Sequence, residues 1–469
     1  TSCPEKQPKQ KVKRLKMIGK YFKLRERQTG IKIECVAGLT TFLTMAYIIF
    51  ANPSILSLEG IPEEDLAGIS RMDKDALIAV TCIVTAITTI IVGIVANAPI
   101  AMAPGMGLNA FFAYLVASRQ MDWQTALGVV FVSGLLFLIA TLLGLRKRIV
   151  EAIPRSLVSA IAVGIGLFIT FIGLKNLGVI VKDPITFVSA GPLTLTVLIG
   201  LFGLLVMIFF EMKKISGGLV MGILASTILA MVFDKEVEMP QQLISLHLNI
   251  QTIAFRLDIL NALKWGFFGT IFTLTFIDMF DSVGTLVACC HQANMVDEQG
   301  KIKGLDRLLG IDAVATVIGA LLGTSTITAY IESAAGIEQG GRSGLTSIVT
   351  GVLFLIALLF VPIVAIVPLY ATAPALIMVG LFMMKEIKKI DFTILEEAFP
   401  AFIIMVMIAL SYSISTGLAF GFISFVLTKI VSGKAKEMKP TMWIIAILSI
   451  LFLTLDQVPN MIEYLRSLM

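Results

Sequence analysis

Long apolar runs separated by short polar segments follow one another along most of the chain, from residue 36 to residue 432. Most runs are about 17 to 25 residues long, the length that an α-helix needs to cross roughly 30 Å of hydrocarbon. The pattern predicts an all-α polytopic membrane protein with fourteen transmembrane segments, seven in each half. The expected spans of the first half are 36–56, 76–95, 98–116, 125–145, 153–173, 192–211 and 216–233. Those of the second half are 262–290, 304–322, 324–338, 343–362, 367–384, 398–413 and 416–432.

The two halves share a sequence repeat. The segment "IPRSLVSAIAVGIGLFI" from residue 153 and the segment "VPLYATAPALIMVGLFM" from residue 367 both place Gly-Leu-Phe at the same distance after a proline. The first span also resembles the eighth, with Phe42 matching Phe272. Because seven is an odd number, a second set of seven spans begins on the opposite side of the membrane from the first. The sequence therefore predicts two inverted 7-helix repeats, an architecture of secondary transporters.

Two expected spans, the third and the tenth, contain residues that disfavour a continuous helix. Residues 97–114, "NAPIAMAPGMGLNAFFAY", contain two prolines and two glycines, and residues 322–341, "LGTSTITAYIESAAGIEQGG", contain a Gly-Thr-Ser-Thr run. Unwound backbone at bilayer depth persists only where it is buried in protein or lines a cavity. We therefore expect broken half-helix segments that begin near residues 105 and 328 and point their N–H groups at a polar ligand. The alternative interpretation is a pair of kinks that serve close helix packing.

Composition supports a membrane protein and excludes other classes. The 469 residues are 57% hydrophobic and 15% charged, with a mean hydropathy of +0.93, far above the values of soluble proteins. Basic clusters at 146–148 and 385–389 place their loops in the cytosol, together with a charged N-terminal tail, residues 1–32. The five cysteines lack metal-ligand spacing, and His247 and His291 form no cluster. Metal and redox chemistry are therefore not expected, and the thiols should be free.

Three acidic residues fall at membrane depth in the second half, Asp278 and Asp281 in the eighth span and Glu332 in the tenth. Each costs about 2.5–3.5 kcal/mol on insertion scales when it lies at the centre of a helix. No Lys, Arg or His lies deep inside spans eight to ten. At least one carboxyl is therefore expected to hold a proton, or to meet a ligand or a cation. The alternative is that these acids cap the exposed ends of broken helices.

Four segments carry a resemblance to a known family. "GLTTFLTMAYIIFANP", "APGMGLNAFFAY", "FIDMFDSVGTLV" and "TSTITAYIESAAGIEQGGRSGLTSIVTG" resemble signature segments of the AzgA-like adenine/guanine/hypoxanthine permeases of the nucleobase/cation symporter-2 (nucleobase/ascorbate transporter) superfamily. The resemblance implies a core domain at residues 33–148 and 262–365, spans 1–4 and 8–11. Spans 5–7 and 12–14, residues 149–261 and 366–433, would form a gate domain. Residues 434–469 remain as a C-terminal tail, whose short apolar run "WIIAILSILFLTL" suits an interfacial helix or a dimer contact.

By the same resemblance, the purine would lie between spans three, eight and ten. The expected substrate-binding residues are Asn109, Asp278, Glu332, Tyr330, Phe276 and Thr328. Proton coupling is expected at Asp281 and Asp278, whose roles the sequence does not rank. A carboxylate accepts two parallel hydrogen bonds from guanine, and aromatic side chains such as Phe276 and Tyr47 offer faces for the flat ring. Thr285 replaces the histidine of related uracil permeases, which argues against a His-assisted proton relay.

These expectations describe a secondary active transporter and not an enzyme. It would import purine nucleobases, with guanine or hypoxanthine favoured and adenine possible, by proton symport with alternating access. We expect no cofactor besides co-transported H⁺, with Na⁺ as the alternative ion, and a homodimer formed through the gate domain in the cell inner membrane, N-terminus cytoplasmic. Its partners would be the purine substrate and membrane lipids, and no nucleic acid. Three acids disfavour an anion exchanger of the same fold, and two aspartates on one helix turn disfavour an aspartyl protease.

Overall fold

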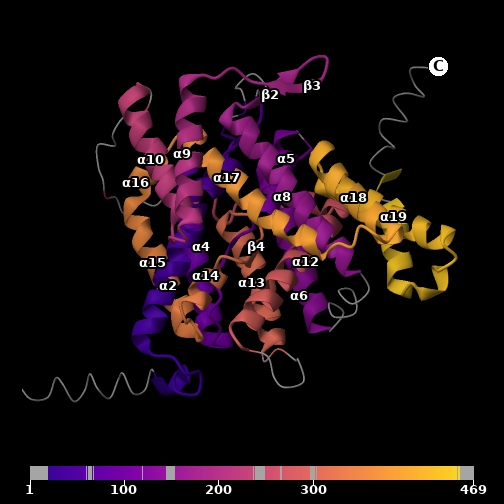
Figure 1. Cartoon of the computed structure of the whole chain (residues 1–469), viewed down its shortest axis with the longest axis horizontal. Coiled ribbons are helices and arrows are strands. Elements are labelled where there is room, and N and C mark those ends of the chain that lie inside the picture. Colours follow the sequence, from indigo (N-terminus) through magenta and orange to yellow (C-terminus); the bar gives the residue numbers. More distant parts are fainter. Residues whose placement is uncertain are drawn as a thin grey trace, which may run out of the picture.

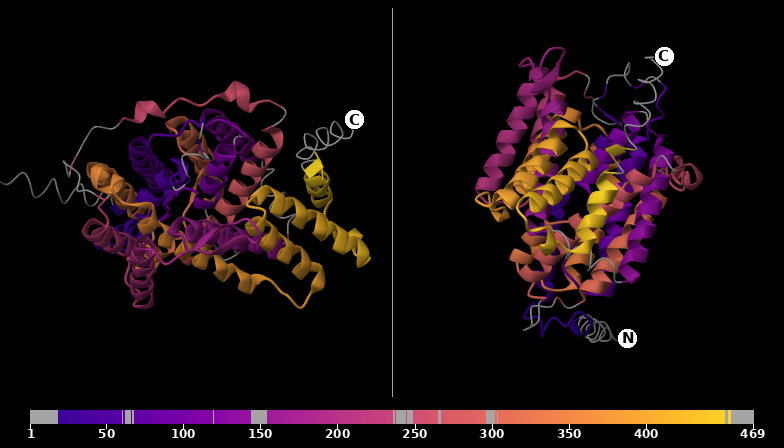
Figure 2. Two further views of the ribbon diagram at one scale, coloured as in Figure 1. Left: turned by 90° about the horizontal axis from the view of Figure 1, so that it is seen from above. Right: turned by 90° about the vertical axis from the view of Figure 1, so that its right-hand side faces the viewer.

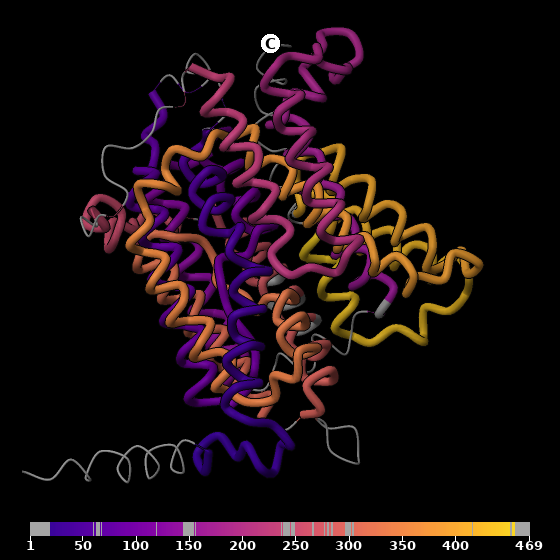
Figure 3. Tube along the Cα trace, turned by 60° about the vertical axis from the view of Figure 1, so that its left-hand side comes forward, coloured from indigo at the N-terminus to yellow at the C-terminus, as the bar shows by residue number. Residues whose placement is uncertain are grey.

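The computed structural model describes residues 19–59, 61, 66, 68–118, 120–143, 154–235, 237, 244, 249–264, 267–295, 302, 304–450 and 453–454. Residues 1–18 of the expected tail, the basic cluster at 146–148 and His247 lie outside this part. The described chain is mainly helical, with a few short strands (Figure 1). A hairpin of β2 (Ile180–Asp183) and β3 (Phe187–Ala190) lies at one end of the molecule, and the first described residues lie at the other (Figures 1 and 3).

The helices of the first half begin and end close to the expected spans. Helices α2, Ile31–Met45, and α3, Ile48–Leu56, are separated by a turn at residues 46–47 and together cover the first span. The others are α4 (Lys74–Ile91) with its π-helical extension η1 (Val92–Ala96), α5 (Met106–Ala117), α6 (Trp123–Leu142), α8 (Arg155–Leu177), α9 (Leu195–Met212) and α10 (Gly218–Phe233).

The second half opens with two short helices, η2 (Ile250–Thr252) and α11 (Ile259–Ala262). Its longer helices are α12 (Phe268–Gln292), α13 (Leu305–Leu322), α15 (Gly344–Ala357), α17 (Leu369–Met383), α18 (Leu395–Leu410) and α19 (Ile414–Val431). Shorter turns between or after them are α14 (Ser333–Glu338), η4 (Leu358–Phe360), α16 (Val361–Ala365), η5 (Met384–Lys389) and η6 (Ala435–Glu437).

Length and apolar composition identify seven candidate membrane spans among the described residues. They are Ile31–Leu56, Lys74–Ala96, Trp123–Leu142, Ser156–Leu177, Leu195–Met212, Gly344–Ala365 and Leu369–Lys389. Shorter apolar helices, at Met106–Ala117, Gly218–Phe233 and Thr416–Val431, fall inside other expected spans, and the C-terminal apolar run forms a helix at Pro440–Ile450. The structure therefore agrees with a helical, polytopic membrane protein.

The two interrupted segments pair with each other as short strands. Strand β1, Met102–Pro104, runs antiparallel to β4, Ile327–Ala329, with Ala103 opposite Thr328. The expectation of an all-α chain is wrong on this point, because helix and strand meet in both segments. Helix α5 begins close to residue 105 as expected. Helix α14 begins at Ser333 and not near residue 328, because the extended residues 327–329 are used for the pairing.

Helices α8 and α17, which carry the repeated proline and Gly-Leu-Phe sequences, pack side by side (Figure 1). The equivalent glycines Gly166 and Gly380 meet at this contact. A Cβ on Gly166 would lie 2.9 Å from the carbonyl oxygen of Gly380, and a Cβ on Gly380 would lie 2.5 Å from the carbonyl oxygen of Gly166. Glycine allows so close an approach of two backbones. The contact is reciprocal, as contacts between equivalent positions across a two-fold axis are.

Polar segments that lie far apart in the sequence meet in the structure. The first described residues lie at the bottom of the right-hand view in Figure 2. In this segment Arg27 donates hydrogen bonds of 2.7 and 2.5 Å to the carbonyls of Asn97 and Arg342. Arg27 belongs to the tail that was expected in the cytosol. The loops of Asp122 and Arg256 line a cavity of about 730 Å³.

Candidate functional site

The candidate site is built around β1 and β4. The N–H of Gly105 donates to the carbonyl of Thr326, and the N–H of Tyr330 donates to the carbonyl of Ala101, both at 3.0 Å. These bonds satisfy backbone groups that an interrupted helix leaves exposed in the membrane. Helix α5 starts directly after β1, and α12 packs against both β4 and α14. Residues from both halves of the sequence therefore share one location.

A tyrosine of the first span holds the acid of the tenth. Tyr47 lies in the turn between α2 and α3, is 1% exposed, and donates a 2.8 Å hydrogen bond to Oε1 of Glu332. Glu332 occupies the N-cap position of α14 and is partly buried. Asp281 on α12 is also partly buried and lies within electrostatic reach of Glu332. It accepts no hydrogen bond from the described side chains or backbone.

Two acid–hydroxyl contacts join α12 and α13. Thr316 of α13 donates to Oδ2 of Asp278 on α12 at 2.9 Å, and Ser282 of α12 donates to Oδ1 of Asp312 on α13 at 2.9 Å. Each helix thus contributes one acid and one hydroxyl, four residues apart. Asp278 is 1% exposed and Asp312 is fully buried, so both carboxyls lie between the helices.

Asn109 belongs to a buried amide and hydroxyl network. Its Nδ2 donates to Oδ1 of Asn52, and its Oδ1 accepts a hydrogen bond from Ser325. Asn52 in turn donates to Thr81 at 2.7 Å. The network links the first, second, third and tenth expected spans. The side chain of Asn109 therefore supports the packing of the interrupted segments.

Two other predicted residues also have internal partners. Thr328 shares a 2.9 Å hydrogen bond with Ser282, and the hydroxyl of Tyr330 donates to the carbonyl of Pro104. Both side chains are buried. The side chain of Phe276 lies outside the described part of the structure. The structure therefore places Asp281 within electrostatic reach of Glu332. Asp278, Asn109, Thr328 and Tyr330 form a layer of buried residues with internal hydrogen-bond partners.

Sequence reasoning missed several members of this layer. Asp312 is a fourth acid at membrane depth, and Asn52 stands in the apolar run "YIIFANP". Both are polar residues inside predicted spans, so the same signal that singled out Asp278 was available for them. Within the described residues, no three His, Cys, Asp or Glu side chains are grouped to hold a metal ion. Cys35, Cys82, Cys289 and Cys290 are free thiols.

Comparison with known proteins identifies relatives along most of the chain. A family model described as a permease family, Xan_ur_permease, matches residues 32–420. A putative permease of Methanocaldococcus jannaschii is 43% identical over 93% of this chain and 98% of its own length. The guanine/hypoxanthine permease PbuG of Bacillus subtilis is 41% identical over 92% and 98%, respectively. The adenine permease AdeP of Escherichia coli is 39% identical over 93% and 95%.

Solved structures of transporters share the fold. The transmembrane domain of a cyanobacterium bicarbonate transporter, BicA, aligns with a TM-score of 0.60 at 15% identity, over 81% of this chain and 96% of that one. The anion transporter SLC26A9 aligns with a TM-score of 0.59 at 12% identity, over 86% and 66%. Identities this low bear on the fold alone. The family model covers residues 32–420, and the sequence relatives align over more than nine tenths of this chain. These matches show that the chain belongs to the nucleobase/ascorbate transporter family of permeases.

Proposed function

We propose that this protein imports purine nucleobases, with guanine or hypoxanthine preferred and adenine as a further substrate, in symport with H⁺. The names of two relatives, one a guanine/hypoxanthine permease and one an adenine permease, support the substrate class. The observation that carries the proposal is the pair of partly buried carboxylates, Asp281 and Glu332, within electrostatic reach of each other. Two such groups suit the hydrogen-bond donors of a purine edge.

Glu332 and Asp281 are assigned to base recognition. Tyr47 donates to one oxygen of Glu332, which fixes the orientation of the carboxylate. The N1–H and exocyclic amine of guanine offer two donors to a carboxylate, whereas hypoxanthine offers N1–H. Asn109, Thr328 and Tyr330 have internal partners, so they are assigned to the support of the site.

Asp278 is assigned to the coupling proton. It is almost fully buried and bonded to Thr316, whereas Asp281 is partly exposed beside Glu332. No Lys or Arg occurs in α12, β4 or α14, so a proton is the simplest counter-charge for a carboxylate there. Release of that proton into the cytosol, where the pH of a respiring cell is higher, would link purine release to H⁺ release.

The transport cycle proposed here is alternating access by two inverted seven-span repeats. Residues 33–148 and 262–365 form the core domain, and residues 149–261 and 366–433 form the gate domain against which the core moves, as in an elevator. The reciprocal contact of Gly166 and Gly380 supports the repeat, because equivalent residues meet where a pseudo-two-fold axis passes. The N-terminus would lie in the cytoplasm and the protein in the cell inner membrane.

A homodimer formed through the gate domain belongs to the same proposal. Helices α18 and α19 project from the body of the molecule (Figure 1) and expose apolar side chains such as Phe402 and Leu427. Such a face suits lipid or a second copy. Mass measurement in lipid nanodiscs decides between them: a mass of two chains supports the dimer, and a mass of one chain contradicts it.

Uptake of radiolabelled purine by proteoliposomes tests the function. With an alkaline interior, guanine and hypoxanthine should accumulate against their gradients, and a protonophore should abolish the accumulation. A Na⁺ gradient without a pH gradient should drive none. Accumulation driven by the Na⁺ gradient would show that Na⁺, and not H⁺, is the coupling ion. Uptake of bicarbonate or sulfate without purine uptake would favour an anion transporter and contradict the proposal.

A further inference from the structure

A hydroxyl of α13 bridges a buried carboxyl and the backbone of β4. The Oγ1 of Thr316 lies 2.9 Å from Oδ2 of Asp278 and 3.0 Å from the carbonyl oxygen of Ile327. Thr316 and Asp278 are almost fully buried, and Ile327 is fully buried as well. Water therefore does not easily replace either hydrogen bond. The donors of the protein itself determine which of the two hydrogen bonds can form.

The register of the two strands explains why this carbonyl needs a donor from α13. The backbone hydrogen bonds that flank the pairing on both sides make Ala103 and Thr328 the hydrogen-bonded pair of the ladder. In an antiparallel ladder the next pair, Pro104 and Ile327, is a non-hydrogen-bonded pair, whose polar groups point away from the partner strand. The Ile327 carbonyl therefore points away from β1, where the Thr316 hydroxyl meets it.

A threonine hydroxyl carries one hydrogen, and here it faces two oxygens. If Asp278 is ionised, both oxygens are acceptors and one contact lacks a hydrogen. If Asp278 carries a proton on Oδ2, the carboxyl donates to Thr316 and Thr316 donates to the Ile327 carbonyl. Every contact then has its own hydrogen. Both hydrogen bonds among the three groups can therefore form at the same time only when Asp278 carries the proton.

We propose that Thr316 is a positioning residue that transmits the protonation state of Asp278 to strand β4, an inference that rests on the proton symport proposed above. When the proton leaves, the hydroxyl turns to the carboxylate and the buried carbonyl of Ile327 loses its donor. Strand β4 ends at Ala329, shortly before Glu332. Loss of the proton thus weakens the anchoring of the segment that presents Glu332 to the base.

The described elements that pack against α12 carry mostly neutral and acidic side chains. Helix α6, which packs against α12, has no titratable side chain. The only basic residue of α13, Arg307, lies in the first turn, far along the helix from Thr316. Among the described residues, the other titratable side chains of these elements are Asp281, Cys289, Cys290 and His291 on α12 itself, Asp306 and Asp312 on α13, Glu338 on α14, Tyr330 and Glu332 beside β4, and Tyr114 on α5.

Two variants isolate the hydroxyl. Thr316→Val keeps the shape of the side chain and removes the hydroxyl, and Thr316→Ser removes the methyl group and keeps the hydroxyl. In proteoliposomes, exchange of labelled guanine without a gradient should continue in both variants, with a raised half-saturation concentration in Thr316→Val, because the Ile327 carbonyl then lacks its donor in both protonation states. Accumulation driven by an imposed pH gradient should fall about tenfold or more in Thr316→Val, the size of a typical coupling effect, and should persist in Thr316→Ser.

The outcomes separate this inference from the function on which it rests. Wild-type protein that ignores the pH gradient refutes proton symport itself. If the wild type responds to the pH gradient and Thr316→Val still accumulates guanine fully, only the role of Thr316 is overturned. Equal loss of accumulation in Thr316→Val and Thr316→Ser overturns that role as well. Complete loss of exchange together with accumulation in Thr316→Val also overturns it, because the hydroxyl is then required for purine transport as such and not for the response to the proton. If Thr316→Val does not fold, Thr316→Ala gives the same comparison.

Discussion

Buried polar residues of this protein differ in how many of their hydrogen-bonding atoms have partners within the protein. Asn109 uses both ends of its amide on protein partners, whereas Glu332 accepts a side-chain hydrogen bond from Tyr47 on one oxygen and is partly exposed as a residue. A buried polar group without a partner is costly, so most such groups are satisfied internally. The exceptions at membrane depth are therefore the residues to test first as ligands of the base.

Replacing Glu332 by Gln should weaken guanine binding by about 1.5–3 kcal/mol, because the neutral amide loses a charge-assisted hydrogen bond. Binding to purified protein measures the effect directly. Glu338→Gln is the matched control, since Glu338 lies on the same short helix, is exposed, and bonds Gln292. Equal affinities of the Glu332→Gln variant and the wild type would remove Glu332 from the site.

Asn109→Ala should act mainly on stability. The change leaves Asn52 without its partner amide and Ser325 without its acceptor, which costs about 1–3 kcal/mol for each buried group left unsatisfied. The thermal unfolding temperature should fall, and the half-saturation concentration for purine uptake should rise as β1 and β4 loosen. An unchanged unfolding temperature with altered uptake would instead make Asn109 a direct ligand.

At the scale of helices and strands, the sequence predicts some features well and others not at all. Span positions and both interruptions follow from hydropathy and from Pro and Gly, because these signals are local. The strands β1 and β4 do not, since three residues are too few to show a period and their partner lies in the other half of the chain. For the same reason the later start of α14 could not be foreseen.

The candidate site shows the same division. The sequence singled out Asp278, Asp281 and Glu332, because a carboxyl at membrane depth is expensive wherever it points. Thr316 and Ser282 carried no such signal, since a hydroxyl in a membrane helix usually bonds to its own helix. Their importance comes from contacts across α12 and α13, which only the folded chain contains.

Helix α15 depends on an acid from another element. Glu34 of α2 is fully buried and accepts hydrogen bonds from the backbone N–H groups of Arg342, Ser343 and Thr346 at 3.0–3.2 Å, and from the hydroxyl of Thr346 at 2.6 Å. A carboxylate at a helix N-terminus satisfies donors that the helix leaves free and interacts favourably with its dipole.

Glu34→Gln should therefore destabilise the protein by about 1.5–3 kcal/mol. The charge-assisted hydrogen bonds become neutral ones, and the NH₂ group of the glutamine side chain faces N–H and O–H donors instead of acceptors. Thermal unfolding of the purified protein measures the loss. Glu26→Gln, at an exposed residue that forms an ion pair with Lys23, is the control and should leave the unfolding temperature nearly unchanged. Equal unfolding temperatures for the two variants would contradict the capping role.

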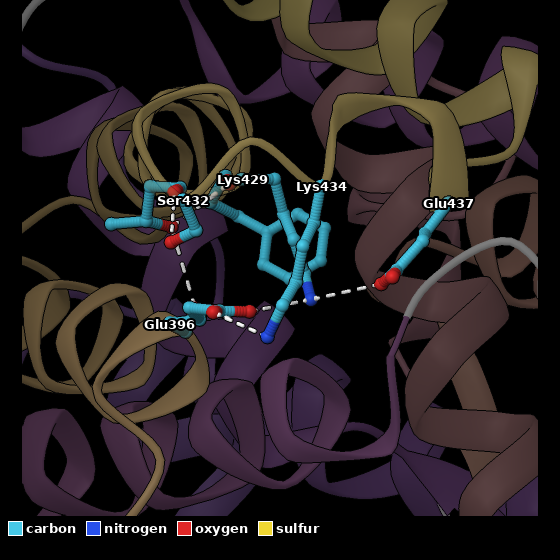
Figure 4. Close-up of polar contacts among 7 residues, drawn as sticks. Glu396, Lys429, Ser432, Lys434 and Glu437 are labelled. Carbon is cyan, nitrogen blue, oxygen red and sulfur yellow. Dashed lines mark hydrogen bonds and ion pairs between the residues drawn. The ribbon is translucent and has the colours of Figure 1, made fainter.

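At the scale of the whole molecule, an ion-pair cluster ties the last helices together. Glu396, at the start of α18, bonds Lys434 at 2.7 Å and Lys429 of α19 at 2.9 Å (Figure 4). Glu437 lies 3.9 Å from Lys429 on the other side. The hydrogen bond from Lys434, followed by that from Lys429, lowers the pKa of Glu396 to about 2 from its ordinary value of 4.5.

This shift predicts how the stability of the region depends on pH. Because the folded-state pKa is lowered, the contribution of Glu396 is fully present above about pH 4.5 and is lost as the pH falls towards 2. The difference in unfolding temperature between the wild type and Glu396→Gln should be constant from neutral pH down to about 5 and should shrink below that. High salt should also reduce it.

Glu397→Gln, one residue along the same helix, is the control for that experiment. It should show no comparable change of the difference with pH. A difference between wild type and Glu396→Gln that stays constant down to pH 3 would mean that the ion pairs seen at Glu396 do not contribute to the stability of the folded protein.

The pairing of β1 with β4 also bears on how the protein is made. Residues 102–104 leave the ribosome long before residues 327–329 exist, so β1 has no partner while the first half enters the membrane. Backbone groups without hydrogen bonds are expensive in hydrocarbon, at several kcal/mol each. The nascent first half must therefore keep this segment beside water or within the insertion machinery until the tenth span arrives. Closure of the strand pair, and with it of the candidate site, becomes one of the last steps of biogenesis.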